Sequence, residues 1–124
     1  MEKELYLGVD VHKDCILTAV AEEGRKGQVR ASAVISNDLH AVEKWIARLR
    51  KAYGKETRLR ACYEAGPCGF GLARRLGQLG VECEVVAPSL TPKRSGDRIK
   101  TDKRDARKLA RLLRAGELTP VYIP

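Results

Sequence analysis

The sequence predicts an α/β domain built on a five-stranded mixed sheet, in which three antiparallel strands precede two parallel strands and helices flank the sheet. Short apolar segments separated by a glycine-containing turn fill the first third of the chain, and helical and strand-like periods alternate after them. The chain has 124 residues, of which 44% are hydrophobic. A chain of this size can bury one hydrophobic core without disulfides or a structural metal.

The first three strands are predicted at Leu5–Val11, Cys15–Ala21 and Gln28–Ile35. Each is short and rich in apolar or β-branched residues, which is typical of strands. Two glycines in Glu23–Gly27 provide a turn between the second and third. We therefore expect the chain to open as an antiparallel meander.

The first helix is predicted to begin at Leu39, after the capping residues of Ser36–Asp38, and to end near Gly54. Apolar residues recur there at steps of three and four, which gives an amphipathic helix. These residues are Leu39, Val42, Ile46, Leu49 and Tyr53. Trp45 lies beside this stripe, and we expect it in the core rather than in a ligand site.

The fourth strand is predicted at Leu59–Tyr63 and leads directly into Glu64. A second helix follows the turn at Ala65–Pro67 and runs to about Leu79, and a fifth strand follows at Glu82–Ala87. Because helices connect these last strands to the sheet, we expect the strands to be parallel to their neighbours.

The segment from Pro88 to Gly116 holds ten basic and three acidic residues, so it carries almost all of the net charge of +8. We expect an irregular loop over Pro88–Thr101 and a last helix over Asp102–Ala115. Such a concentrated basic segment is typical of nucleic-acid binding, although a solvated helix face would have the same composition. The candidate nucleic-acid-binding residues are Lys93, Arg94, Arg98, Lys100, Lys103, Arg104, Arg107, Lys108 and Arg111.

Four acids are candidates for a shared site. Asp10 and Glu64 lie at the ends of two predicted parallel strands, where open α/β sheets place their ligands. In a helix beginning at Asp102, Asp102 and Asp105 share the sheet-facing side and the bases cover the opposite side. A bound divalent cation would offset the cost of these unpaired carboxylates. The alternative is that Asp102 and Asp105 only cap the helix.

Several other classes are disfavoured. Cys15, Cys62, Cys68 and Cys83 form no C-x-x-C pair, so we expect reduced thiols rather than a zinc site or a disulfide framework. No apolar run is long enough to span a membrane, and the N-terminus has the wrong charges for a secretory signal. We expect a soluble cytoplasmic protein, associated with the nucleoid when bound to DNA.

Three segments resemble the N-terminal domain of the DEDD transposases of the insertion-sequence one-ten family: Gly8–Lys13, Tyr63–Gly69 and Lys100–Ala106. That domain is similar to Holliday-junction resolvases of the RuvC type and has the RNase H-like fold. The resemblance implies that Asp10, Glu64, Asp102 and Asp105 form an acidic tetrad. The tetrad would bind Mg²⁺, with Mn²⁺ as a substitute, for DNA strand cleavage and rejoining.

The resemblance also implies a longer protein. Residues 1–117 would form the catalytic domain, and residues 118–124 would begin a linker to a C-terminal domain that bears a nucleophilic serine. The implied partners are DNA, a guide RNA and further copies of the chain in a dimer or a higher oligomer. Phosphate contacts by Lys and Arg do not distinguish DNA from RNA.

Two other function classes remain open from the residues. The chain could be a nucleic-acid-binding module whose acids are structural. It would then have no specific metal site, and Asp10→Asn would not change metal binding. It could also be an actin-like or sugar-kinase-like ATPase, which shares the opening strand and acid. The chain lacks the length for two such lobes and has no Gly-rich phosphate hairpin.

Overall fold

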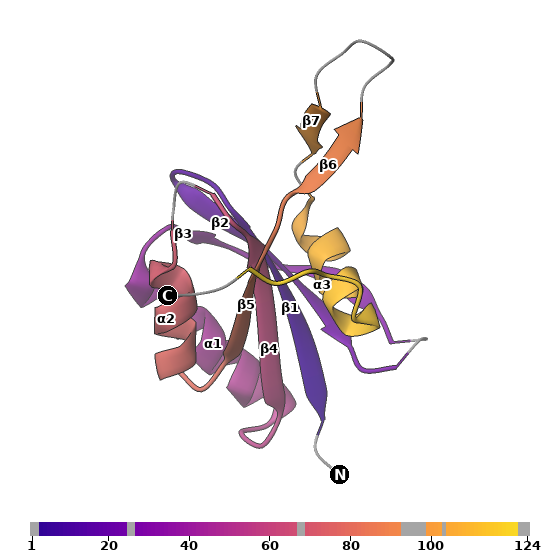
Figure 1. Cartoon of the computed structure of the whole chain (residues 1–124). Helices are drawn as coiled ribbons and strands as arrows, with labels where there is room; N and C mark the ends of the chain where they lie inside the picture. Colours follow the sequence, from indigo (N-terminus) through magenta and orange to yellow (C-terminus); the bar gives the residue numbers. More distant parts are fainter. Residues whose placement is uncertain (1–2, 25–26, 67–68, 93–98, 103, 122–124) are drawn as a thin grey trace.

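A computed structural model describes residues 3–24, 27–66, 69–92, 99–102 and 104–121. It confirms the α/β class and the five-stranded mixed sheet, whose strand order is β3-β2-β1-β4-β5 (Figure 1). The antiparallel part consists of β1 (Glu4–Val11), β2 (Cys15–Glu22) and β3 (Val29–Ser36). The strands β4 (Arg58–Glu64) and β5 (Glu82–Val86) extend β1 in parallel. This order and these directions are those of an RNase H-like fold.

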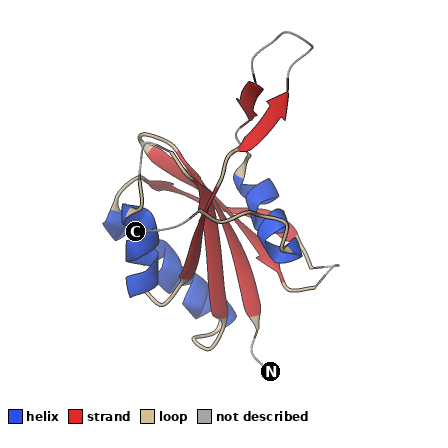
Figure 2. Cartoon of the chain, in the orientation of Figure 1, coloured by secondary structure: helices blue, strands red, loops and turns tan. Residues whose placement is uncertain are grey.

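In the described part of the chain, three helices cover the two faces of the sheet. The helices α1 (Leu39–Tyr53) and α2 (Gly71–Gln78) pack on one face, and α3 (Ala106–Ala115) packs on the other (Figure 2). The predicted cap of α1 is confirmed, since the Asp38 side chain accepts a hydrogen bond of 2.8 Å from the backbone N–H of Ala41. Asp38 has extended backbone angles and thereby satisfies a donor that the helix leaves unpaired.

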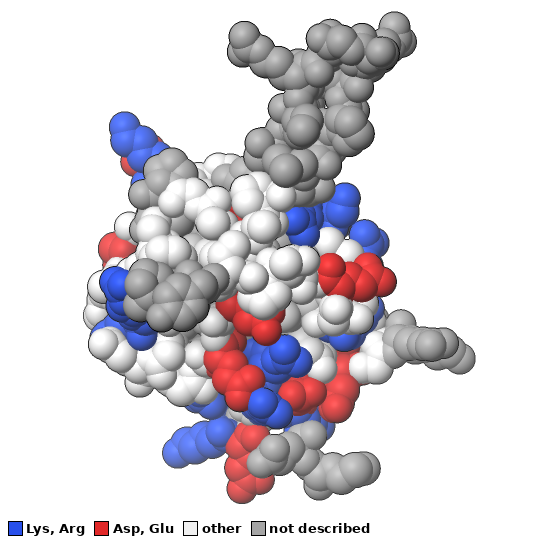
Figure 3. Space-filling view, in the orientation of Figure 1, with Lys and Arg blue, Asp and Glu red and all other residues white. Residues whose placement is uncertain are grey.

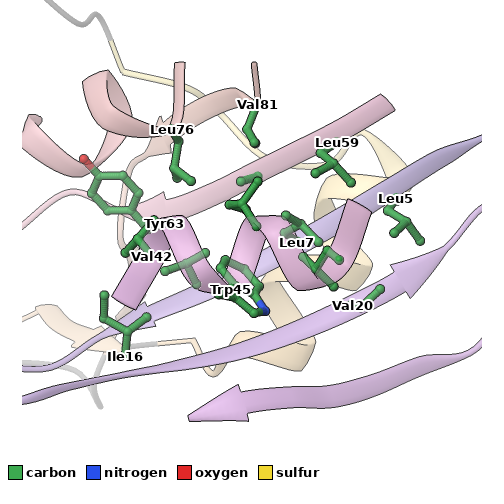
Figure 4. Close-up of a cluster of buried hydrophobic side chains, with 14 of the residues drawn as sticks. Leu5, Leu7, Ile16, Val20, Val42, Trp45, Leu59, Tyr63, Leu76 and Val81 are labelled. Carbon is green, nitrogen blue, oxygen red and sulfur yellow. The ribbon is translucent and has the colours of Figure 1, made fainter. Parts of the chain in front are cut away.

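Large aliphatic and aromatic side chains fill the space between the sheet and α1 and α2 (Figure 4). Trp45 is 2% exposed, so its predicted core position is confirmed. Leu39, predicted on the buried stripe, is 52% exposed instead. It is the first residue of α1, and the buried positions of the helix begin one turn later at Val42.

Small side chains dominate the opposite face, where α3 packs against β1 and β2. The buried residues of this second cluster are Tyr6, Ala19, Ala21, Cys62, Val86, Ala106, Leu109, Ala110 and Leu113. The small side chains let the helix backbone approach the sheet closely.

The structure corrects two predicted boundaries after β5. The expected irregular loop contains a β-hairpin, formed by β6 (Ser89–Pro92) and β7 (Ile99–Asp102), which projects from the sheet in Figure 1. The last helix begins at Ala106 rather than Asp102. Asp105 has extended backbone angles, and its side chain caps α3 by accepting a 2.8 Å hydrogen bond from the N–H of Lys108.

The second helix also begins later than predicted, at Gly71. Gly69 has a φ of +66°, which a right-handed helix cannot contain, and it ends the turn that follows β4. The segment after α3 runs beside β5. The N–H of Ala87 donates to the carbonyl of Thr119, and the N–H of Val121 donates to the carbonyl of Val85. None of the helices in the described part of the chain is long and apolar enough to cross a membrane.

Candidate functional site

The sheet places Asp10 and Glu64 side by side. On β1 and β4, Leu7 pairs with Ala61 and Gly8 pairs with Cys62. Continuing this parallel register puts Asp10 level with Glu64 at the carboxyl ends of both strands. Because side chains alternate along a strand, both acids lie on the face that α3 covers. The predicted juxtaposition of these two strand ends is confirmed.

Asp10 is a buried acid at this edge. It is 8% exposed, and its Oδ2 lies 3.0 Å from Nε2 of His12. The His12 side chain is 44% exposed, so it closes the outer side of the carboxylate while its ring remains in contact with solvent. This contact fixes one orientation of the Asp10 carboxylate.

Glu64 is held by Arg104. The backbone N–H of Arg104 donates a 2.9 Å hydrogen bond to Oε1 of Glu64, and Nε of Arg104 lies 3.2 Å from Oε2. The two side chains are 13% and 8% exposed, which makes this a largely buried ion pair. A guanidinium ion therefore provides a counter-charge for Glu64.

Arg104 also connects two other parts of the fold. Its Nη2 donates a 2.7 Å hydrogen bond to the carbonyl of Ala87, which follows β5, and its own backbone immediately precedes the cap of α3. The prediction that the neighbouring bases point away from the acids is wrong for this residue. Arg104 lies before the helix, so the helical spacing that would turn it outward does not apply.

Gly8 explains why α3 begins beside the acids. A Cβ atom at Gly8 would lie 1.9 Å from the carbonyl oxygen of Ala106 and 2.6 Å from the backbone nitrogen of Ala110. The first turns of α3 thus rest directly on the backbone of β1, two residues before Asp10. Any side chain at this position would push the helix away from the sheet.

The two remaining acids of the predicted tetrad are placed differently from each other. Asp105 is exposed and caps α3, so the predicted placement of its side chain against the sheet is wrong. Asp102 ends β7, and its side chain lies outside the described part of the structure. Within the described residues, no three His, Cys, Asp or Glu side chains are grouped closely enough to hold a metal ion.

The predicted nucleic-acid-binding residues fall into three groups. Lys93, Arg94, Arg98 and Lys103 lie outside the described residues, as does the side chain of Lys100 in β7. Arg104 is committed to Glu64. Arg107, Lys108 and Arg111 line a groove of about 360 Å³ together with Val29 and Asp105.

These three groove residues differ from the bases on β4. Arg58 and Arg60 lie within 2.6 Å and 3.7 Å of Glu82 and Glu84, so their charges are locally offset. In the part of the chain that the structure describes, Arg107, Lys108 and Arg111 take part in no ion pair. Figure 3 shows a group of basic side chains on the right of the view with acidic side chains below it, and a mixture of both charges below the centre. The groove is therefore the stronger attractor for an anion.

Cysteines contribute no metal site among the described residues. Cys15, Cys62 and Cys83 are free thiols, and Cys68 lies outside the described residues. Burial raises the pKa of the Cys62 thiol, and it raises the pKa of Cys83 to about 12. Neutral, buried thiols are poor ligands and poor nucleophiles.

Two residues of this site escaped prediction, and one of them left a signal. A glycine inside a buried strand, such as Gly8, marks a close approach of another backbone. The sequence carries no signal for the pairing of Arg104 with Glu64, because the direction of the Arg104 side chain depends on where α3 begins. The structure also pairs His12 with Asp10.

Comparison with known proteins agrees with this arrangement. A family model described as transposase, of the DEDD type of IS110, matches residues 7–124. The chain is 49% identical over 123 residues to a Sinorhizobium fredii protein named "Putative transposase y4qE", covering 98% of this chain and 30% of that protein. It is 39% identical over 115 residues to the transposase for insertion sequence element IS1533 of Leptospira borgpetersenii, covering 93% of this chain and 32% of that protein.

The chain spans about a third of the length of these curated relatives. The family match nevertheless covers residues 7–124, which include both strand-end acids, Gly8 and the cap of α3. The chain belongs to the IS110-type DEDD transposase family.

Proposed function

We propose that this chain is the catalytic domain of a DNA transposase that cleaves and rejoins DNA strands with a divalent cation. The observation that carries the proposal is the juxtaposition of Asp10 and Glu64. Both carboxylates are largely buried on neighbouring parallel strands, at the edge where α/β sheets bind ligands. Burying two carboxylates at this edge costs free energy of folding, so a role in catalysis explains them better than a role in stability does.

The donor set suits a hard cation. Carboxylate oxygens are the preferred protein ligands of Mg²⁺, and Mn²⁺ accepts the same ligands. Asp10 and Glu64 would hold the ion, and Asp102 and Asp105 would complete the tetrad. A cation bound there supplies Lewis-acid stabilisation of the charge that develops on phosphate oxygens during strand cleavage.

The residues around the acids prepare the site. His12 orients the Asp10 carboxylate through its 3.0 Å contact, and Arg104 keeps Glu64 from repelling Asp10. The groove residues Arg107, Lys108 and Arg111 attract the DNA backbone next to these acids. The relatives are about three times as long as this chain. We therefore assign the nucleophilic serine, the guide RNA contacts and the assembly of several copies to the longer protein.

A second function is favoured by one observation. Arg104 neutralises Glu64, and Asp105 caps α3, so both acids have structural roles already. The chain could then be a nucleic-acid-binding module without its own metal site. This reading predicts nucleic-acid binding that is independent of divalent cations.

Mn²⁺ titration followed by electron paramagnetic resonance distinguishes the two functions. We expect Asp10→Asn to weaken Mn²⁺ binding at least about tenfold. The control is Asp14→Asn, an exposed aspartate in the turn between β1 and β2. Equal binding by the chain and both variants, with nucleic-acid affinity retained, would support the binding module instead.

Asp105→Asn separates capping from metal binding. Asparagine caps helices as well as aspartate does, so α3 should stay intact while a cation ligand loses its charge. The proposal predicts an unchanged melting temperature and weaker Mn²⁺ binding. Unchanged metal binding would reduce Asp105 to a cap.

A further inference from the structure

The face of the sheet that carries the acids is only partly covered by α3. Its row at Gly8 meets the helix, because Gly8 lies under Ala106 and pairs with the buried Ala19. The next row on this face contains Asp10, which pairs with Leu17, which in turn pairs with Val34. Leu17 is 37% exposed and Val34 is 69% exposed. This row thus leads from the free edge of the sheet at β3 to the acidic site.

An exposed aliphatic pair beside a buried acid is unusual for a surface that only faces water. Contiguous exposed apolar residues with polar neighbours mark binding surfaces more often than single scattered ones do. We call Leu17 and Val34 the apolar shelf. Their side chains form an exposed apolar surface in the same row of the sheet as Asp10.

The positive charge next to the apolar shelf indicates which kind of ligand binds there. The groove formed by Val29 and α3, with Arg107, Lys108 and Arg111, opens on the same face of the same edge strand. A ligand that spans the groove, the shelf and the acids needs a repeated anion and a flat apolar group. A nucleic-acid strand with an unpaired base has both, whereas the bases of a duplex are stacked inside it.

We propose that the apolar shelf receives the base of an unpaired nucleotide beside the phosphate that the acids act on. The inference rests on the proposed function and adds that the bound DNA strand is locally unpaired. The groove holds the phosphates of the strand, and Leu17 and Val34 contact one base. The shelf contributes affinity without reading sequence, since every base has an apolar face.

The test compares two labelled oligonucleotides of about 15 units by fluorescence anisotropy, oligo-dT and an abasic strand with the same phosphates. We expect the chain to bind oligo-dT about fivefold to tenfold more tightly than the abasic strand. The double variant Leu17→Ser with Val34→Ser should lose this preference. Its salt dependence should stay the same, because that slope counts phosphate contacts.

Two further variants control for folding. Leu39→Ser makes the same change at an exposed leucine on α1, on the opposite face of the sheet, and should keep the full preference. Val34→Ser alone changes the most exposed of these side chains, so it should fold normally and reduce the preference by about half on a logarithmic scale.

Three outcomes would contradict the inference, and they differ in what they say about the proposed function. Retention of the preference by the shelf variants, with normal salt-dependent binding, overturns this inference and leaves the proposed function intact. Absence of salt-dependent binding to either strand overturns both. A drop in sedimenting mass on Val34→Ser would assign the shelf to a second copy of the chain and overturn the inference.

Discussion

The two faces of the sheet are built for different purposes. The face under α1 and α2 buries large side chains such as Leu7, Trp45 and Leu76, each 2% exposed or less. The face under α3 buries Gly8, several alanines and Cys62, and its last row ends in acids and exposed aliphatic residues. The face under α1 and α2 supplies most of the stability of the fold. The face under α3 has smaller side chains, which let the N-terminus of α3 lie close to Asp10 and Glu64.

This contrast predicts where damage separates stability from function. Substitutions under α1 should cost free energy of unfolding without altering ligand binding below the melting temperature. Substitutions under α3 should affect both, because the same contacts position the site.

The largest expected loss of stability follows Trp45→Ala. Removing this buried indole should lower the free energy of unfolding by about 4 kcal/mol, through lost burial and the cavity left behind. Urea denaturation measures it, with Leu39→Ala on the same helix as the control, since that exposed residue should cost less than about 0.5 kcal/mol. Mn²⁺ affinity at low temperature should not change. A loss of metal binding would mean that the two faces are coupled.

Gly8→Ala should have the next largest effect. The added methyl group meets backbone atoms of α3, which cannot move aside independently, so we expect a loss of about 3 kcal/mol. Metal binding should weaken as well, because α3 carries Asp105. Gly77→Ala is the control: nothing lies within 4 Å of its added Cβ, and alanine favours the α2 helix. If Gly8→Ala were as harmless as Gly77→Ala, the close seating of α3 would be disproved.

Arg104→Ala should cost about 2 kcal/mol. It leaves the Glu64 carboxylate without its guanidinium, although other donors remain near a site that is not fully buried. A double-mutant cycle with Glu64→Gln should show coupling of about 1 kcal/mol. Arg58→Ala, at the exposed pair with Glu82, should cost less than about 1 kcal/mol. Equal costs at the two pairs would contradict the special role of Arg104.

The last effect is absent at neutral pH and appears only in alkali. Burial raises the pKa of Cys62 in the folded chain, while the unfolded thiol ionises near about pH 8.5. The neutral thiol therefore stabilises the fold at neutral pH, and this contribution declines as the pH rises above about 9. The advantage of the natural chain over Cys62→Ala in unfolding free energy should fall by up to about 1.4 kcal/mol per pH unit. A difference that is constant with pH would show that the thiol is accessible to water.

The elements of the sheet could be predicted because their signals are local. Alternation, apolar runs and glycine turns define β1 to β5, and spacing defines α1. The predicted start of α3 at Asp102 lies too early, because Asp102 and Asp105 are both good capping residues and only the backbone angles select Asp105. The hairpin of β6 and β7 was missed because prolines and many charges obscure its short strands.

The site was predicted in part for the same reason. The strand ends at Asp10 and Glu64 follow from parallel connectivity, which is a property of the topology. The pairing of Arg104 with Glu64 joins residues far apart in the sequence, and a one-turn error in the start of α3 reverses its predicted direction. The shelf of Leu17 and Val34 depends on a β-sheet register and on how far α3 extends, and neither is encoded in a local pattern.

The proposed function requires Asp10 and Glu64 to form one half of a divalent-cation site. Anomalous diffraction from Mn²⁺-soaked crystals of the chain tests it most directly. We expect an anomalous peak in contact with both carboxylates, and loss of that peak in Asp10→Asn crystals. Peaks at surface carboxylates alone, with Arg104 still paired to Glu64 and nothing beside Asp10, would contradict it.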